Sequence, residues 1–201
     1  MSTPRKMPIG TRTDAFLIEN FLSPKECEAF IAASEGRGYE EAMISTGMGQ
    51  IIAKDVRNND RLMWDDTELA ARWWNRARDF FPLAFGRWQA IGLNERFRFY
   101  RYRPGQKFSQ HRDGSFQRSK TEMSWMTLMV YLNEGFEGGR TRFDFVSEPE
   151  PVSITPAAGL ALAFMHDRVH EGEEVKSGVK YVLRTDVMYR KAQQGPAEED
   201  R

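Results

Sequence analysis

The stretch Tyr102–Asp113 reads YRPGQKFSQHRD and ends in a His-x-Asp pair. In an extended backbone, residues i and i+2 project to the same side, so His111 and Asp113 are expected to face one point. A second histidine, His170, lies in the downstream segment Phe164–Gly172. Two histidines and one carboxylate occupy one face of an octahedral metal and leave positions open, which suits non-haem Fe(II) and oxygen. We expect the rest of the chain to form a cage around this site.

The histidine content limits the choice of ligands. The chain has three histidines, His111, His166 and His170, so any site with two histidine ligands uses two of them. His170 is preferred because it follows the end of an apolar strand and precedes Glu171 and Gly172. We interpret His166 as a hydrogen-bonded turn histidine. Two alternatives stay open: a catalytic zinc site has a similar ligand count, and a surface His-x-Asp pair needs no metal.

Composition favours one domain. The 201 residues are 40% hydrophobic and can bury one core. We expect a flexible amino-terminal segment over 1–13, a domain over 14–190 and a polar tail over 191–201. Lys+Arg and Asp+Glu balance at 29 each, which gives no case for nucleic acid or an anionic membrane surface. A single cysteine, Cys27, fits a reducing compartment, and no secretory or membrane-spanning apolar run appears. These features predict a cytoplasmic protein.

The first part of the chain has two helical patterns. Ser23 and Glu26 have the spacing of a capping box, and Pro24 suits the first helical position. The pattern predicts a helix from there to about Ser34, with a preceding short strand over 14–21.

A second helix is predicted from the Asp65–Thr67 region to just before Pro82. Its apolar side chains recur at spacings of three and four residues. Tryptophans at helical spacing usually pack against a sheet, so we expect Trp73 and Trp74 to belong to the core rather than to a ligand site.

The second half of the chain has the period-2 pattern of strands. These are separated by turns about every ten residues, which argues for an α+β protein with a mainly antiparallel sandwich or barrel. The predicted strands are Glu95–Tyr102, Ser124–Leu132, Thr141–Phe145, Gly159–Phe164 and Lys180–Tyr189.

The last strand carries candidate anchors for a cosubstrate. An α-keto dicarboxylate that chelates iron needs a buried cation at its far end. Lys180 and Arg184 are four residues apart and share a face. The alternative is a pair of exposed charges on an edge strand. Tyr131, on the side of its strand that carries Thr127 and Met129, could donate its hydroxyl to the same carboxylate; the alternative is ordinary core packing.

With these motifs, the sequence resembles the iron(II)- and 2-oxoglutarate-dependent oxygenases of the prolyl 4-hydroxylase type, over about Phe16 to Tyr189. The matching motifs are Tyr102-x-x-Gly105-Gln106 before His111-x-Asp113, Tyr131-Leu132-Asn133, Gly138-Gly139-x-Thr141-x-Phe143, and His170-Glu171-Gly172 followed by Gly178-x-Lys180.

The resemblance implies a double-stranded β-helix, or jelly roll, with amino-terminal supporting helices. Carried over, the iron ligands are His111, Asp113 and His170. Lys180 binds the distal carboxylate of 2-oxoglutarate, and Tyr102 and Tyr131 line the cosubstrate pocket.

Two departures from the family pattern stand out. Glu174 and Val175 replace a frequent Pro-Val pair, which affects a local turn. Arg184 is a second inward cation that competes with Lys180 for the cosubstrate. Because related halogenases lack the carboxylate supplied here by Asp113, the resemblance implies hydroxylation.

The implied reaction is hydroxylation of an unactivated C–H bond by Fe(II), 2-oxoglutarate and O2, with release of succinate and CO2, and with ascorbate as a candidate reductant. The expected substrate is a prolyl or other protein residue, or an amino-acid-like molecule. Arg57 and Arg61, in a polar segment that is either a lid or a solvated loop, and Arg98 are candidate substrate residues. The alternatives are a non-catalytic jelly-roll binding module and a metal-dependent enzyme that does not use 2-oxoglutarate.

Overall fold

A computed structural model describes residues 3–46, 49–51, 53, 55–146 and 148–192. Its helical elements are α1 (Pro24–Arg37), α2 (Thr67–Ala77) and the 3-10 turn η1 (Arg78–Phe80). Its strands are β1 (Arg5–Pro8), β2 (Ala15–Glu19), β3 (Glu40–Glu41), β4 (Ile44–Thr46), β5 (Gly49–Ile51), β6 (Asp60–Asp65), β7 (Ala84–Phe85), β8 (Trp88–Leu93), β9 (Arg96–Tyr102), β10 (Phe108–His111), β11 (Gln117–Ser119), β12 (Glu122–Tyr131), β13 (Glu137–Gly138), β14 (Thr141–Phe143), β15 (Val152–Ile154), β16 (Ala161–Met165), β17 (His170–Gly172), β18 (Val175–Ser177) and β19 (Lys180–Lys191).

Both predicted helices form, and their starts follow from capping. At α1, the Ser23 hydroxyl accepts from the Glu26 amide at 3.3 Å, while the Glu26 carboxylate accepts from the Ser23 amide at 2.8 Å. The helix continues past Ser34 to Arg37 and ends at Gly38, whose φ of 85° suits a residue without a side chain. At α2, the Asp66 carboxylate accepts from the amide of the third helical residue.

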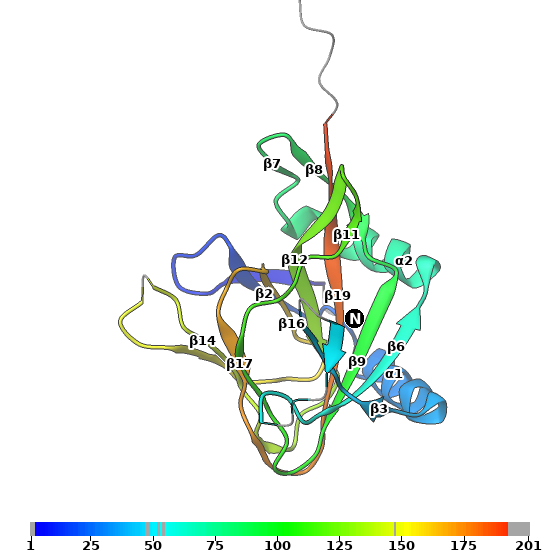
Figure 1. Ribbon diagram of the computed structural model, residues 1–201, viewed down its shortest axis with the longest axis vertical. Helices are drawn as coiled ribbons and strands as arrows, with labels where there is room; N and C mark the ends of the chain where they lie inside the picture. Colours follow the sequence, from blue (N-terminus) through cyan, green and yellow to red (C-terminus); the bar gives the residue numbers. More distant parts are fainter. Residues whose placement is uncertain (1–2, 47–48, 52, 54, 147, 193–201) are drawn as a thin grey trace, which may run out of the picture.

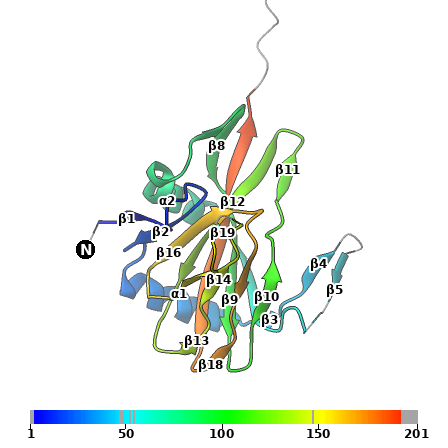
Figure 2. The same ribbon diagram turned by 90° about the vertical axis from the view of Figure 1, so that its left-hand side faces the viewer.

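The strands form a large and a small antiparallel sheet (Figure 1). The main path of the large sheet is β1-β2-β16-β12-β19-β9-β6-β3, and the small sheet has the order β10-β17-β14-β15. Figure 1 shows α1 and α2 on one side of the large sheet and β14 and β17 on the other. In Figure 2 the hairpin of β4 and β5 projects from the body of the molecule. The predicted α+β fold with a double-stranded β-helix and supporting helices is confirmed.

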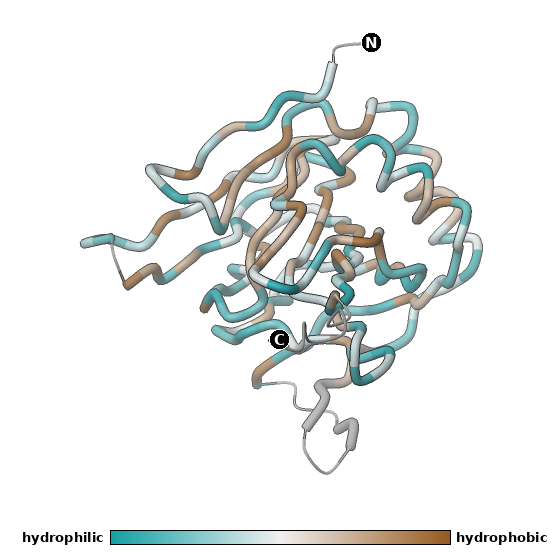
Figure 3. The backbone as a smooth tube through the Cα atoms, turned by 90° about the horizontal axis from the view of Figure 1, so that it is seen from above, coloured by the Kyte–Doolittle hydropathy of each residue, from teal (hydrophilic) through white to brown (hydrophobic). Residues whose placement is uncertain are grey.

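Alternation along the central strands divides the interior into two cores. On β12, Leu128 and Val130 face the helices, whereas Met129 and Tyr131 face the small sheet. Trp73 of α2 is buried in the helix-side core and Trp74 packs against that core, which confirms their predicted packing role. In Figure 3 brown, hydrophobic segments are frequent in the middle of the molecule, while many outer segments are teal, that is, hydrophilic. The candidate ligands lie on the side of the small sheet.

The amino-terminal segment contains a short strand. Within 1–13, which the sequence predicts to be flexible, β1 pairs with β2 from Arg5 opposite Glu19 to Pro8 opposite Phe16. The strand forms because an open sheet edge offers unpaired backbone groups to a polar segment without its own apolar pattern. Of the predicted polar tail, 193–201 lies outside the described residues. Among the described helices, none is long and apolar enough to cross a membrane.

Candidate metal centre and adjoining groove

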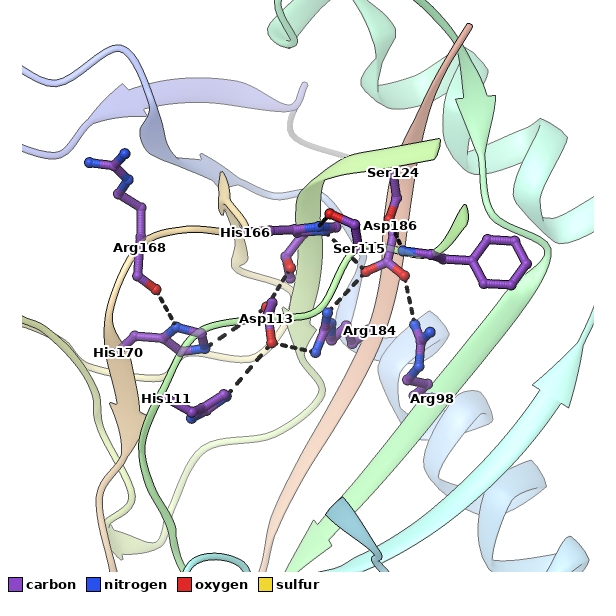
Figure 4. Close-up of polar contacts among 12 residues, drawn as sticks. Arg98, His111, Asp113, Ser115, Ser124, His166, Arg168, His170, Arg184 and Asp186 are labelled. Carbon is purple, nitrogen blue, oxygen red and sulfur yellow. Dashed lines mark hydrogen bonds and ion pairs between the residues drawn. The ribbon is translucent and has the colours of Figure 1, made fainter. Parts of the chain in front are cut away.

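The three predicted metal ligands meet between the two sheets. His111 ends β10 and lies directly opposite His170 of β17 in the antiparallel register. Asp113 follows β10 by two residues, and its backbone amide donates to the His166 carbonyl at 3.0 Å. One potential ligand atom from each of the three side chains lies within 4.8 Å of the other two. Figure 4 shows the three side chains converging from these separate segments. The structure thus assembles the set predicted from the His-x-Asp motif.

Hydrogen bonds orient both imidazoles for metal binding. Nδ1 of His111 lies 2.8 Å from the Ser109 carbonyl, and Nδ1 of His170 lies 3.0 Å from the Arg168 carbonyl. A carbonyl can only accept, so each Nδ1 carries the proton and each Nε2 keeps a free lone pair. These Nε2 atoms lie 3.6 and 4.0 Å from the Asp113 carboxylate. Burial lowers the pKa of His170 to about 4, which keeps it neutral at pH 7.

Asp113 is held as a carboxylate. Burial alone raises its pKa, but Arg184, together with the two histidines, holds the pKa of Asp113 well below its usual value. Arg184 donates to one carboxylate oxygen at 2.6 Å, and the Thr127 hydroxyl donates to the other at 2.5 Å. Two imidazoles and one ionised carboxylate fit the donor set that holds Fe(II) with open positions.

A buried charge network continues behind Asp113 (Figure 4). Arg184 also donates to Asp186 at 3.1 Å, and Asp186 accepts from Arg98 at 2.8 Å. His166 lies in a turn, 3.6 Å from Asp186 and 3.4 Å from the Ser115 hydroxyl, outside the three-ligand group. Its placement agrees with its interpretation as a hydrogen-bonded turn histidine. Each buried carboxylate in this network has a cationic partner, as burial requires.

Lys180 is a buried cation in the same cavity as the three ligands. Only 2% of the residue is exposed, and its ammonium donates to the Gly139 carbonyl at 2.6 Å. Burial lowers the pKa of Lys180 to about 7. Within the described part of the chain, no carboxylate forms an ion pair with it, in contrast to Arg184. An amine buried without a counter-ion is suited to receive an anionic ligand.

The two predicted tyrosines lie at different depths. Tyr102 lines the cavity and sits opposite Lys180 in the register of β9 and β19. Tyr131 was also predicted to line the cavity, but it lies behind the wall: its hydroxyl donates to Thr141 Oγ1 at 2.7 Å, and Thr141 lines the cavity. Both rings flank Lys180, with centroids 5.1 and 5.6 Å from its nitrogen.

The sequence reasoning missed two hydroxyl residues. Thr127 contacts the carboxylate of Asp113, and Thr141 presents its side chain to the cavity beside Lys180. The sequence contains a hint of each residue. Thr127 is four residues before Tyr131 and therefore lies on the same face of the strand, and Thr141 belongs to the Gly-Gly-x-Thr motif. Neither alternation nor the motif says what the hydroxyl contacts.

The predicted substrate arginines lie in a groove beside the metal ligands. Arg57, Arg61 and Arg98 line it together with His111 and Asp113. Its volume is about 490 Å³, within the range of small-ligand sites. Arg96, two residues before Arg98 on β9, instead pairs with Asp65 at 2.9 Å on the surface.

Comparison with known proteins gives a consistent picture. Residues 97–185 match the model of the 2OG-Fe(II) oxygenase superfamily. The chain is 23% identical over 194 residues to prolyl 4-hydroxylase 1 of Arabidopsis thaliana, covering 82% of this chain and 65% of the plant protein. The chain therefore spans slightly less than two thirds of that relative.

Two solved structures share the fold. A viral collagen prolyl hydroxylase from Paramecium Bursaria Chlorella virus-1, in complex with 2OG, superposes with a TM-score of 0.62 at 22% identity, covering 91% of this chain and 99% of the viral one. A prolyl hydroxylase from Trichoplax adhaerens, in complex with a hypoxia inducible factor peptide fragment, gives a TM-score of 0.70 at 15% identity, covering 87% of this chain and 83% of the other. At these identities the likeness concerns the fold.

Proposed function

We propose that this chain, a prolyl 4-hydroxylase-like member of the 2OG-Fe(II) oxygenase superfamily, hydroxylates a C–H bond of a peptidyl or amino-acid-like substrate. The family uses Fe(II), 2-oxoglutarate and O2. The observation that carries the proposal is that one cavity contains both the three-ligand group and a buried lysine without a counter-ion. This pairing matches a cosubstrate that chelates the metal at one end and presents a carboxylate at the other.

The residues of the cavity have separable roles. His111, Asp113 and His170 would hold Fe(II), which when bound would supply O2 activation for the coupled oxidation of 2-oxoglutarate, to succinate and CO2, and of the substrate C–H bond. Lys180 pairs with the distal carboxylate of 2-oxoglutarate. Arg184 is already bound to Asp113 and Asp186, so its role is to position the ligating carboxylate rather than to bind the cosubstrate.

The walls of the cavity keep water from the reacting atoms. Phe164 packs edge-on against the His170 ring with centroids 4.5 Å apart, and Phe108 stacks on the His111 ring at 3.5 Å. Met129 and Val182 add further apolar surface to the lining. Apolar contacts around the ligands fix their orientation and lower the local dielectric, which strengthens the charge interactions of the site.

Anaerobic titration of Fe(II) and 2-oxoglutarate into the purified protein tests the proposal. Chelation of the keto acid produces a weak visible charge-transfer band, which we expect in the wild type and not in Lys180→Met at the same concentrations. Binding of iron without the band in the wild type contradicts the use of 2-oxoglutarate. Thr67→Ala, an exposed substitution on α2, controls for the effect of mutagenesis and purification and should retain the band.

A peptide substrate is supported by the position of the groove. It opens beside His111 and Asp113 and is lined by polar and aromatic side chains, such as Ser115 and Phe116, as well as arginines. The Trichoplax adhaerens prolyl hydroxylase was solved with a peptide fragment. Oxygen incorporation into proline-containing peptides, read by mass spectrometry with succinate formation in parallel, tests this substrate class.

A further inference from the structure

The groove beside the metal ligands has a strong excess of positive charge. Two of its arginines have buried acidic partners, since Arg98 pairs with Asp186 and Arg184 pairs with Asp113 and Asp186. Among the described residues that line the groove, Asp113 is the sole carboxylate. The arginines are Arg57, Arg61, Arg98, Arg112 and Arg184.

Arg57 is buried, fixed and incompletely paired. Its guanidinium lies between two aromatic rings, 4.5 Å from the Tyr100 centroid and 4.4 Å from the Phe108 centroid. Nε donates to Asn59 at 2.7 Å, whereas the described residues offer no hydrogen-bond partner to the buried Nη2. The residue is 6% exposed, and no ion pair to it occurs within the described part of the chain. A rigid, desolvated cation of this kind is costly unless an anion is bound.

Arg61 presents a second unpaired donor nearby. It lies directly opposite Tyr100 in the register of β6 and β9, and Arg57 stacks on that tyrosine. Arg61 is 9% exposed, and no residue in the described ranges forms a hydrogen bond with its buried Nε. Within the described residues, its ion pair is to the mostly exposed Glu40, with 3.6 Å between Nη2 and the carboxylate. This pair uses Nη2, so the Nε donor of Arg61 stays available to a ligand.

The segment that carries Arg57 is fastened to the strand that carries a metal ligand. The Ser109 amide donates to the Val56 carbonyl at 2.8 Å, and the Lys107 amide donates to the Asn58 side chain at 2.7 Å. Phe108, between these two anchors, contacts the guanidinium of Arg57 and stacks on His111. The position of Arg57 relative to the metal is therefore set by β10.

We propose that Arg57 and Arg61 bind a carboxylate of the substrate and so place the neighbouring C–H bond at the metal. This inference rests on the proposed hydroxylase function and specifies its substrate class as carboxylate-bearing. Two unpaired N–H groups on two cations match the two oxygens of one carboxylate, and a charge-assisted bond of this kind is stronger than a neutral one. The carboxylate belongs either to an acidic side chain next to the hydroxylated residue or to a free carboxyl terminus.

The probes are pairs of small molecules that differ only in charge. One arm uses capped proline-containing peptides in which a residue flanking proline is Glu or Gln. The other uses N-acetylproline and its amide. Calorimetry measures their binding to the protein loaded with Fe(II) and 2-oxoglutarate under anaerobic conditions. We expect the charged member of at least one pair to bind about tenfold to a hundredfold more tightly. The arm that shows this ratio identifies the source of the carboxylate.

Substitutions test whether the two arginines cause the difference in affinity between the charged and the neutral probe, called here the affinity ratio. Arg57→Met and Arg61→Met should each reduce the ratio toward one, while Arg72→Met, which removes an exposed charge on α2, should retain it. Arg57→Lys keeps the positive charge but lacks the planar guanidinium, so it should retain part of the ratio. This variant replaces Arg57→Met in the test if Arg57→Met does not fold.

The inference is overturned if no pair shows a preference for the charged member, or if the preference survives both methionine substitutions. The charge-transfer band, recorded in the same samples, separates this failure from that of the proposed function. A band without charge preference rejects the carboxylate site alone, whereas loss of the band in the wild type rejects the hydroxylase.

Discussion

Replacing Lys180 by methionine should weaken 2-oxoglutarate binding while leaving the protein without ligand folded. The residue is buried, and its amine has one hydrogen bond, to the Gly139 carbonyl. Methionine has a similar length and no charge, so the variant keeps the packing and removes the cation. Loss of one partner from a buried charge pair costs about 2–5 kcal/mol. This corresponds to an affinity at least about 30-fold weaker.

The pH dependence of the same affinity gives a second signature. Because burial lowers the pKa of Lys180 to about 7, the site without ligand loses its proton as the pH rises through 7. A bound carboxylate stabilises the protonated amine, so binding takes up one proton above that pH. The dissociation constant of 2-oxoglutarate should therefore rise about tenfold per pH unit above 7 and level off below it. Lys180→Met should show no such slope.

Stability without ligand should move in the opposite direction from affinity. The pKa of Lys180 is about 7 in the folded state and 10.5 in its ordinary state, so between these values the unfolded chain binds more protons. Because of this linkage, the free energy of unfolding of the wild type rises as the pH increases from 7 to 10.5, and at pH 7 the buried lysine destabilises the fold. Lys180→Met should unfold at the same or a higher temperature than the wild type at pH 7.

Calorimetric titration with 2-oxoglutarate between pH 6 and about 9, together with thermal unfolding, measures all three quantities. A variant with unchanged affinity would show that another residue, Arg184 foremost, anchors the cosubstrate. A large drop in unfolding temperature at pH 7 would instead make Lys180 a structural residue and refute its assignment as a cation kept for a ligand.

Three further outcomes follow from the structure. Asp113→Ala should lose Fe(II), because it removes the anionic ligand; metal analysis after desalting checks this, and retention of one iron per chain would exclude the assigned ligand set. Arg184→Met leaves Asp113 without its cation and should lower the free energy of unfolding by about 3–5 kcal/mol, which denaturant titration measures. The substitution should also raise the pKa of Asp113, so the variant should bind iron more weakly as the pH falls through that pKa; metal binding at two pH values measures this. Gly159→Ala places a Cβ 2.0 Å from the Leu22 carbonyl oxygen at a φ of +79° and should cost about 2 kcal/mol or more, and an unchanged unfolding temperature would contradict the close approach.

The convergence of the three candidate ligands was predictable from a local motif and from one later histidine. His111, at the end of β10, and Asp113 are two residues apart, and His170 begins β17, which pairs with β10 so that the two histidines lie opposite each other. The helix starts were equally local, since Ser23 and Glu26 satisfy each other within one turn. A sequence pattern predicts contacts between residues a few positions apart, and it predicts strands that have a strong apolar pattern.

The burial of the two candidate substrate arginines was not predictable, for the opposite reason. Arg57 and Arg61 lie in a segment with the composition of a solvated loop, yet both are buried, because Arg57 stacks on Phe108 and Arg61 pairs across the sheet with Tyr100. These partners are more than thirty residues away in the sequence. Charge alone cannot say whether a guanidinium meets water or an aromatic ring, and only the pairing of strands decides it.

The register of the last strand explains why its two inward cations have different roles. Lys180 lies opposite Tyr102, and Arg184 lies opposite Arg98, so both face the cavity but are separated by about 13 Å along the strand. Arg184 is at the metal end, where it neutralises Asp113. Lys180 is therefore held away from the ligands, and the distance between the two cations leaves room for a dicarboxylate that reaches from the metal to the lysine. Exchanging the two residues would place the compact ammonium beside the metal ligand and the planar fork at the far end. Since a guanidinium can also bind a carboxylate, the variant with both residues exchanged should bind 2-oxoglutarate more tightly than Lys180→Met does, which calorimetry measures. The Asp113 carboxylate should be held less firmly than in the wild type, which weaker metal binding would show.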